Sequence, residues 1–301
     1  MTQTVLILGG SGKIGRHATQ AFLAAGWNVR QFNRKTDDMT QSALGADVIV
    51  NGLNPPNYHN WAKLIPEITA QVIAAAKASG AAVVIPGNIY NYGNQPGVLD
   101  ENTPQRAQTR KGKIRIAMEQ SYRAAGVQTI ILRAGNFIDP SSADDLFRQV
   151  LLKSLAKGKI ASLGQPDAMQ AYAYLPDWAR AAVMLAEKRD QLAQFEDVPF
   201  EGHAFSMREL ADFAAAQRGK PVRIGGFPWW LMTIAAPVWE LAREMAEMRY
   251  LYDMPHTISA AKRSRLLPDF VPTPKEDVLA GLLRQGNPNQ TMRTGSSAVD
   301  A

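Results

Sequence analysis

Apolar and polar positions change their period along the first half of the chain. Short runs rich in β-branched and other apolar residues stand at 4–8, 28–32, 47–51, 82–85 and 129–132. Between them, residues 14–25, 61–78 and 114–125 repeat apolar positions at helical spacing. Strands that alternate with helices predict a parallel sheet covered on both faces. We therefore expect an α/β fold with a doubly wound parallel sheet of Rossmann type, whose ligand crevice lies at the carboxyl ends of the strands.

The alternation loosens after residue 133. Helical patterns recur at 144–156, 176–187 and 207–217, and a Thr-Pro-Lys-Glu capping box at 273–276 predicts one further helix. We expect a dinucleotide-binding core over 1–135 and a smaller carboxyl-terminal, substrate-side region over 136–285, with segments that return to the sheet. Apolar residues are few over 286–301, which predicts a flexible tail.

Composition narrows the chemistry. Apolar residues make up 46% and charged residues 20% of the 301 positions, as in ordinary globular proteins. Cysteine is absent, which excludes disulfides, thiolate nucleophiles and cysteine zinc sites, and the four histidines are scattered, so we expect no metal site. The first residues carry no basic region or cleavage site of a secretory signal, and we expect a cytoplasmic protein.

The net charge of +6 raises nucleic acid, an anionic membrane or a phosphorylated small molecule as partners. No nucleic-acid-binding motif is present, so we expect a small-molecule substrate and no nucleic acid. The longest apolar run, 227–239, is too short to span a bilayer and contains Pro228 and Pro237. We interpret it as a core, lid or dimer-interface helix and expect no membrane association; a membrane-surface segment is the alternative, and a homodimer is left open.

A glycine-rich turn follows the first predicted strand. Residues 9–15 read Gly-Gly-Ser-Gly-Lys-Ile-Gly and open the first predicted helix. Glycines at this junction allow the backbone to approach a pyrophosphate, which the N–H groups and positive dipole of the helix attract. The motif predicts dinucleotide binding, because it stands between a strand and a helix at the start of a βαβ unit.

The end of the second predicted strand bears on the choice of cofactor. NAD-binding proteins usually place an acidic residue there to hold the ribose 2′-hydroxyl, whereas this chain has Asn33 and Arg34. A guanidinium suits a 2′-phosphate. We therefore expect NADP(H), with NAD as the alternative.

The chain resembles the short-chain dehydrogenase/reductase superfamily, in its extended and atypical branch that includes NAD-dependent epimerase/dehydratase-like proteins. Besides the glycine turn, the resemblance rests on Asp-Val-Ile-Val-Asn at 47–51, Pro-Gly-Asn-Ile-Tyr-Asn-Tyr-Gly at 86–93, Asp-Glu-Asn-Thr-Pro at 100–104, Leu-Arg-Ala-Gly-Asn-Phe at 132–137, Ala-Tyr-Leu-Pro-Asp-Trp-Ala-Arg at 173–180 and Leu-Leu-Pro-Asp-Phe-Val-Pro-Thr-Pro at 266–274. It extends over nearly the whole chain. The motifs are specific for the family and much less so for any one activity.

The resemblance implies a Ser or Thr after the fourth strand and a TyrxxxLys pair on the next helix, in which Tyr is the acid/base and Lys holds the ribose. This chain departs at both places. The Ser position falls on Asn88, and the Tyr position falls on Thr109 if Lys113 is the family lysine. In the second register the pair becomes Lys111 and Arg115. Neither register supplies the tyrosine.

Two tyrosines just after the fourth strand are candidates to replace it. Tyr90 or Tyr92 could donate the proton, with Lys113 and Asn88 as further catalytic candidates; aromatics that pack the crevice wall are the alternative. The cofactor-binding candidates are Gly9, Ser11, Gly12, Lys13, Ile14, Asn33, Arg34, Leu53, Asn54, Gly87 and Asn136.

These observations favour an NADP(H)-dependent oxidoreductase that acts on a carbonyl or alkene of a small organic substrate. The missing TyrxxxLys pair leaves two alternatives. One is a non-catalytic NADP(H)-binding sensor or assembly factor, and the other is a sugar-nucleotide epimerase or dehydratase.

Overall fold

The structure is a computed structural model that describes residues 2–142 and 146–286. Its centre is a six-stranded sheet in the order β10-β6-β4-β3-β1-β2, in which every neighbouring pair is parallel. The strands are β1 (Thr4–Leu8), β2 (Asn28–Phe32), β3 (Val48–Asn51), β4 (Ala82–Gly87), β6 (Thr129–Arg133) and β10 (Phe195–Pro199). The expected doubly wound parallel sheet is confirmed. Its strand order reverses at β1, which places a crevice between the carboxyl ends of β1 and β3.

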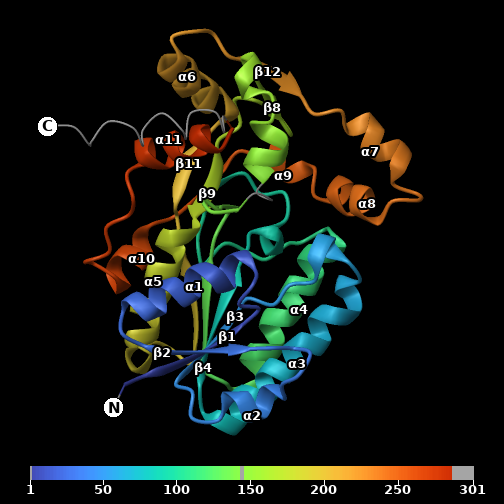
Figure 1. Cartoon of the computed structure of the whole chain (residues 1–301). Coiled ribbons are helices and arrows are strands. Elements are labelled where there is room, and N and C mark those ends of the chain that lie inside the picture. Colours follow the sequence, from blue (N-terminus) through green and yellow to red (C-terminus); the bar gives the residue numbers. More distant parts are fainter. Residues whose placement is uncertain (1, 143–145, 287–301) are drawn as a thin grey trace, which may run out of the picture.

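Helices cover both faces of this sheet (Figure 1). Along β1, Val5 and Ile7 face a core shared with α1 (Lys13–Ala24) and α5 (Leu175–Glu187), while Leu6 and Leu8 face α3 (Trp61–Ser79), α4 (Arg110–Ala125) and α2 (Met39–Ala43). Successive side chains of a strand point to opposite faces. The apolar run from Val5 to Leu8 therefore matches a strand that is buried on both sides.

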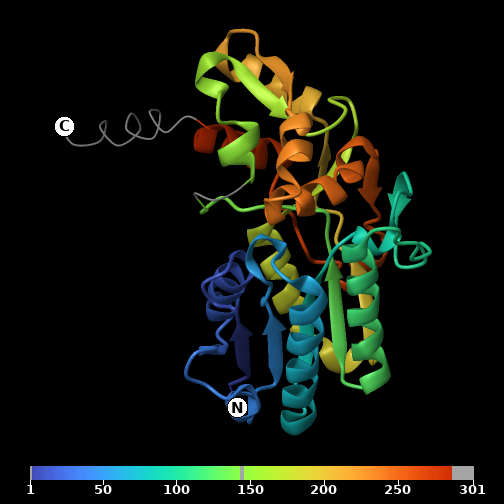
Figure 2. The same cartoon turned by 90° about the vertical axis from the view of Figure 1, so that its right-hand side faces the viewer.

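The second half of the chain builds a smaller lobe at the carboxyl ends of the strands (Figures 1 and 2). Its strands are β7 (Asn136–Ile138), β9 (Gln170–Tyr174) and β11 (His203–Phe205) in one sheet, β8 (Lys159–Ser162) with β12 (Arg223–Gly226), and β13 (His256–Ile258) with β5 (Gly97–Leu99). Its helices are α6 (Met207–Arg218), α7 (Trp229–Ala235), α8 (Glu240–Glu247), α9 (Tyr250–Asp253), α10 (Ala261–Leu266) and α11 (Lys275–Gly286). Segments α5 and β10 return to the large sheet.

Most element boundaries lie within a few residues of the expected ones. Helix α4 begins four residues before the expected start, because the Thr109 hydroxyl accepts the Gly112 N–H and caps it. Residues 147–151 form a π-helical turn where part of a longer helix was expected, and residues 144 and 145 of that prediction lie outside the described residues. The tail expected from residue 286 lies almost wholly outside them as well.

Asp177 of α5 forms hydrogen bonds with Thr273, which precedes α11 in the chain. It lies in the first turn of α5, and its carboxylate accepts the N–H and the hydroxyl of Thr273, both at 2.7 Å. The N-cap of α5 is Tyr174, so Asp177 is not the cap that its position after a proline suggests. Its hydrogen bonds anchor the chain ahead of α11 instead.

Candidate functional site

The glycine turn joins β1 to α1 in a backbone geometry that larger residues cannot adopt. Gly9 has a φ of +78°, and an added Cβ at Gly15 would lie 2.2 Å from the Gly9 carbonyl oxygen. Gly12 donates its N–H to that oxygen at 2.9 Å and forms the N-cap of α1, with no side chain to occupy the helix end. Ser11 is exposed at the tip, and the partly buried Lys13 and Ile14 begin α1. This cradle fits the pyrophosphate of a dinucleotide.

The carboxylate of Asp37 lies at the end of β2, although the residues that directly follow the strand are not acidic. Asn33 and Arg34 are exposed, and the chain then turns back so that Asp37 accepts the Asn33 N–H at 2.8 Å. Hydrogen bonds from the Thr36 hydroxyl and this N–H hold the pKa of Asp37 below its usual range. An ionised carboxylate therefore lies beside the strand end where a dinucleotide places its adenine ribose.

The turn after β3 closes against the glycine turn. An added Cβ at Gly9 would meet the carbonyl oxygen of Gly52 at 2.9 Å, so the two backbones are in contact. Leu53 donates its N–H to the side chain of Asn51, and Asn54 accepts a hydrogen bond from Arg115 of α4 at 3.3 Å. The crevice thus runs from the glycine turn, past Leu53 and Asn54, to the start of α4.

A strained loop follows this turn. Asn57, Tyr58 and Asn60 all have positive φ, at 52°, 60° and 45°. Such conformations cost about 1–3 kcal/mol each in residues other than glycine and persist where the surroundings hold them. Glu240 of α8 holds this loop, accepting a hydrogen bond from the Asn60 N–H and pairing with His59. Strain of this kind gathers at functional sites.

The strained loop brings Tyr58 to the crevice. Its ring lies 5.2 Å from that of Trp61, and the Lys111 ammonium lies 5.0 Å from its centroid. Tyr58 neighbours Tyr90, which begins the short turn after β4, and it raises the pKa of that residue. No sequence motif marks Tyr58; only backbone strain singles it out.

The four catalytic candidates from the sequence lie in different surroundings. The side chain of Asn88 accepts the Tyr90 N–H at 3.0 Å, and the backbone of Asn88 accepts a hydrogen bond from Arg133. Burial raises the pKa of Tyr90 well above its usual range, and neighbouring Tyr58 raises it further. Tyr92 is buried and donates its hydroxyl to the Asp100 carbonyl at 2.9 Å. Lys113 is exposed on α4.

Lys111 and Arg115, the second register of the family pair, both face the crevice. Lys111 is fully buried and pairs with Glu244 and Glu247 of α8. The Arg115 guanidinium lies 4.8 Å from the Trp61 ring, and burial lowers its pKa while Tyr90 opposes that effect. Two cations therefore occupy the places at which this register aligns the family Tyr and Lys.

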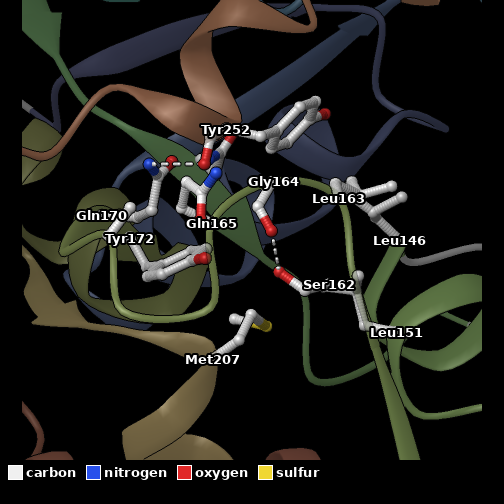
Figure 3. A pocket seen from close by; sticks show the side chains of 12 residues that line it. Leu146, Leu151, Ser162, Leu163, Gly164, Gln165, Gln170, Tyr172, Met207 and Tyr252 are labelled. Atoms are coloured by element: carbon white, nitrogen blue, oxygen red, sulfur yellow. Dashed lines mark hydrogen bonds between the residues drawn. The ribbon is translucent and has the colours of Figure 1, made fainter. Parts of the chain in front are cut away.

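The second lobe contains a pocket at the carboxyl-end side of the large sheet (Figure 3). Asn136, placed by β7, lines it together with Tyr172 of β9 and Tyr252 of α9. Tyr252 also lies within electrostatic range of Tyr58 and Tyr90. The side-chain carbonyl oxygen of Gln170 is buried in the pocket wall with no hydrogen-bond partner in the structure.

Gly87 contributes by its lack of a side chain. An added Cβ there would lie 2.5 Å from Ile131 and 3.0 Å from the backbone of Arg133, so the absence of a side chain lets the ends of β4 and β6 pack together.

Among residues 2–142 and 146–286, no group of three or more acidic or histidine side chains is arranged to hold a metal ion. No helix in the same part of the chain is long and apolar enough to cross a membrane.

Comparison with known proteins agrees with this geometry. Residues 5–91, which contain the glycine turn and Tyr90, match the model of the NAD dependent epimerase/dehydratase family. The resemblance to that family is confirmed over this segment. No curated protein matches the sequence.

Solved structures share the fold over almost the whole chain. MoeE5 in complex with UDP-glucose and NAD is 16% identical, with 95% of this chain and 99% of that one covered and a TM-score of 0.73. UDP-glucuronic acid 4-epimerase from Bacillus cereus, in complex with UDP-glucuronic acid and NAD, is 15% identical, with 95% and 100% covered and a TM-score of 0.74. A putative epimerase from Burkholderia cenocepacia is 18% identical, with 94% and 98% covered and a TM-score of 0.74.

The expected preference for NADP(H) is wrong. The structures of MoeE5 and of the Bacillus cereus epimerase hold NAD. The physical reason lies at Asp37, whose carboxylate folds back to the end of β2 although it stands four residues after Asn33 in the sequence. A 2′-phosphate near this carboxylate would be repelled, whereas a ribose hydroxyl can donate to it.

Proposed function

We propose that this chain is an NAD-dependent enzyme of the epimerase/dehydratase type, which oxidises an alcohol carbon of its substrate to a ketone. Nucleotide sugars are the first substrate class to test, because the solved relatives above hold UDP-sugars together with NAD. One observation carries the proposal: Tyr90 follows β4 at the same edge of the sheet as the glycine turn, and Tyr58 and the pocket residue Tyr252 lie within electrostatic range of it.

The glycine turn and Asp37 would hold the dinucleotide, Leu53, Asn54 and Gly87 would line its path, and Asn136 would reach the substrate or the nicotinamide. When bound, NAD accepts the hydride from the alcohol carbon. The proton of the alcohol then needs an acceptor within the pocket. We assign a relay role to Tyr90, whose oxygen would take up this proton as its own hydroxyl proton passes to solvent, so that no ionised phenol is needed. Tyr92 is less suited, because its hydroxyl already donates to the Asp100 carbonyl.

The surroundings of Tyr90 suit a proton relay. Burial and the neighbouring Tyr58 raise the pKa of Tyr90 and keep its phenol protonated, and the positive charge of Arg115 opposes this effect only in part. Asn88 fixes the turn by accepting the Tyr90 N–H. Lys111, held by two carboxylates, positions Tyr58 through its ring, and the exposed Lys113 has no part in this arrangement.

The test is turnover with NAD and a panel of UDP- and GDP-sugars, followed by product identification. Tyr90→Phe should lower kcat by about 10²–10⁴-fold, as expected when a general acid/base is lost, and leave the Kd for NAD unchanged. Tyr92→Phe is the matched control, and its turnover should stay close to that of the unaltered chain. Equal turnover in all three proteins would remove Tyr90 from the reaction.

Net reduction of a carbonyl or alkene is the second candidate. Leu146, Leu163 and Met207 line the pocket, and such apolar walls suit a small organic substrate. The two functions differ in their net use of cofactor, because epimerisation regenerates NAD whereas reduction consumes NADH. A chain that binds NADH but turns over no sugar nucleotide, carbonyl or alkene would instead be a sensor.

A further inference from the structure

Helix α7 and the residues after it expose an apolar surface that the proposed reaction does not use. Five of the nine large apolar side chains that the described residues expose lie within ten positions: Trp230, Leu231, Ile234, Val238 and Trp239. Val238 is 91% exposed, Ile234 70% and Trp230 64%. Contiguous exposed apolar residues of this size mark a binding surface. We call these five residues the apolar edge.

The apolar edge is held in place from within. Trp229, next to Trp230, is buried, packs against Tyr252 and donates its indole N–H to the Leu163 carbonyl. Figure 1 shows α7 at the outer margin of the second lobe, away from the six-stranded sheet. The surface is therefore presented outward by a fixed element and does not complete the core.

Basic residues surround the start of this surface. Residues 146–166 and 213–239 contain no Asp or Glu, although the whole chain has 27. The two segments pair through β8 and β12, where Lys159 lies directly opposite Arg223, and the Arg218 guanidinium bonds to the Ala156 carbonyl. The basic residues of the two segments are Arg148, Lys153, Lys157, Lys159, Arg218, Lys220 and Arg223.

This pairing of like charges would be favoured by a counter-charge from outside. Lys159 and Arg223 are exposed, and like charges on opposite residues of neighbouring strands are unfavourable. Three uncharged residues separate Arg223 from the apolar run 227–239. A basic surface next to an apolar one that carries exposed tryptophans has the composition that binds the interface of an anionic bilayer.

We propose that the apolar edge and the basic β8–β12 pair dock this protein on an anionic lipid surface. Trp230, Ile234 and Val238 insert among the headgroups, and the basic strands bind lipid phosphates. A second copy is the less suitable occupant, because a two-fold interface would bring two positive β8–β12 pairs toward each other. Docking of this kind does not depend on the proposed function.

Vesicle co-sedimentation of the full chain tests the proposal. The chain should bind vesicles of phosphatidylcholine with phosphatidylglycerol, bind phosphatidylcholine alone weakly, and lose binding as salt screens the charges. The double variant Trp230→Ser, Ile234→Ser should bind at least about tenfold more weakly. Its matched control, Val98→Ser with Val271→Ser, removes exposed apolar side chains elsewhere and should bind normally.

A second pair of variants tests the charges. Lys159→Glu with Arg223→Glu should weaken binding to anionic vesicles by about tenfold or more, whereas Lys63→Glu with Lys77→Glu on α3 makes the same change in net charge and should not. Failure to bind anionic vesicles would overturn the proposal. So would equal effects of the two charge variants, or a dimer that ignores vesicles and dissociates when Trp230 and Ile234 are replaced, which would assign the surface to a second copy.

Discussion

At the scale of single residues, the geometry of the crevice depends on glycines that leave no space for a side chain and on the carboxylate of Asp37 at the end of β2. Gly15 packs so closely on Gly9 that a methyl group would overlap the backbone. Asp37 shows why the cofactor was mispredicted. The turn at 33–37 brings Asp37 back to the end of β2. A rule that looks for an acidic residue directly after the strand therefore misses this carboxylate.

Gly15→Ala tests the cradle. The Cβ would lie 2.2 Å from the Gly9 carbonyl oxygen, so the turn must shift, and we expect a loss of about 1–3 kcal/mol of stability and at least tenfold weaker NAD binding. Gly226→Ala, which has open space around the new atom, is the control. Calorimetric titration with NAD measures both, and equal affinities would contradict the assigned role of the turn.

At the scale of elements, the sequence predicts a strand or helix correctly where the spacing of its apolar residues is enough to define the element. β1 and β2 begin and end as expected, because each residue run matches a buried or half-buried strand between glycine-containing turns. β10 was missed, because Phe-Glu-Asp-Val-Pro carries two acidic residues. Their charges are compensated by Lys262 and Arg133, partners from distant parts of the chain that no local pattern reveals.

The contact between α4 and α8 could not be predicted from the sequence either, so both registers of the family pair, with Lys113 or with Lys111, remained open. Lys111 is buried between Glu244 and Glu247, whereas Lys113, two positions later, is exposed. A cation and its carboxylates separated by over a hundred residues can be paired only in three dimensions.

Lys111→Met should therefore destabilise the fold by about 1–3 kcal/mol, because the buried Glu244 loses its lysine partner while Arg110 still pairs with it. Lys113→Met, on the same helix, should change stability by less than about 0.5 kcal/mol. Urea unfolding gives both values, and hydrogen exchange over 240–247 should accelerate only in the first variant. Similar stabilities of the two variants would show that the α4–α8 contact contributes little.

At the scale of the whole molecule, both lobes contain buried or half-buried tyrosines. Burial raises the pKa of Tyr122, Tyr172 and Tyr252 above the usual range and raises that of Tyr250 to about 12. In the unfolded chain these phenols ionise near pH 10. Above that pH the unfolded state loses protons that the folded state keeps, so the free energy of unfolding must fall.

We expect this fall to approach about 1.4 kcal/mol per pH unit for each such tyrosine between pH 10 and its pKa in the folded chain. Denaturant unfolding at pH 9 and pH 11 measures the slope. Tyr122→Phe should reduce it by the share of one residue, and an unchanged slope would mean that Tyr122 ionises in the folded state as it does in the unfolded one.

The central claim is that the crevice at the carboxyl ends of β1 and β3 binds NAD. The most direct measurement is fluorescence titration of the full chain with NADH and with NADPH. Because Asp37 is ionised at the end of β2, NADH should bind at least about tenfold more tightly than NADPH. NADPH binding as tight as NADH binding, or no binding of either, would contradict the account.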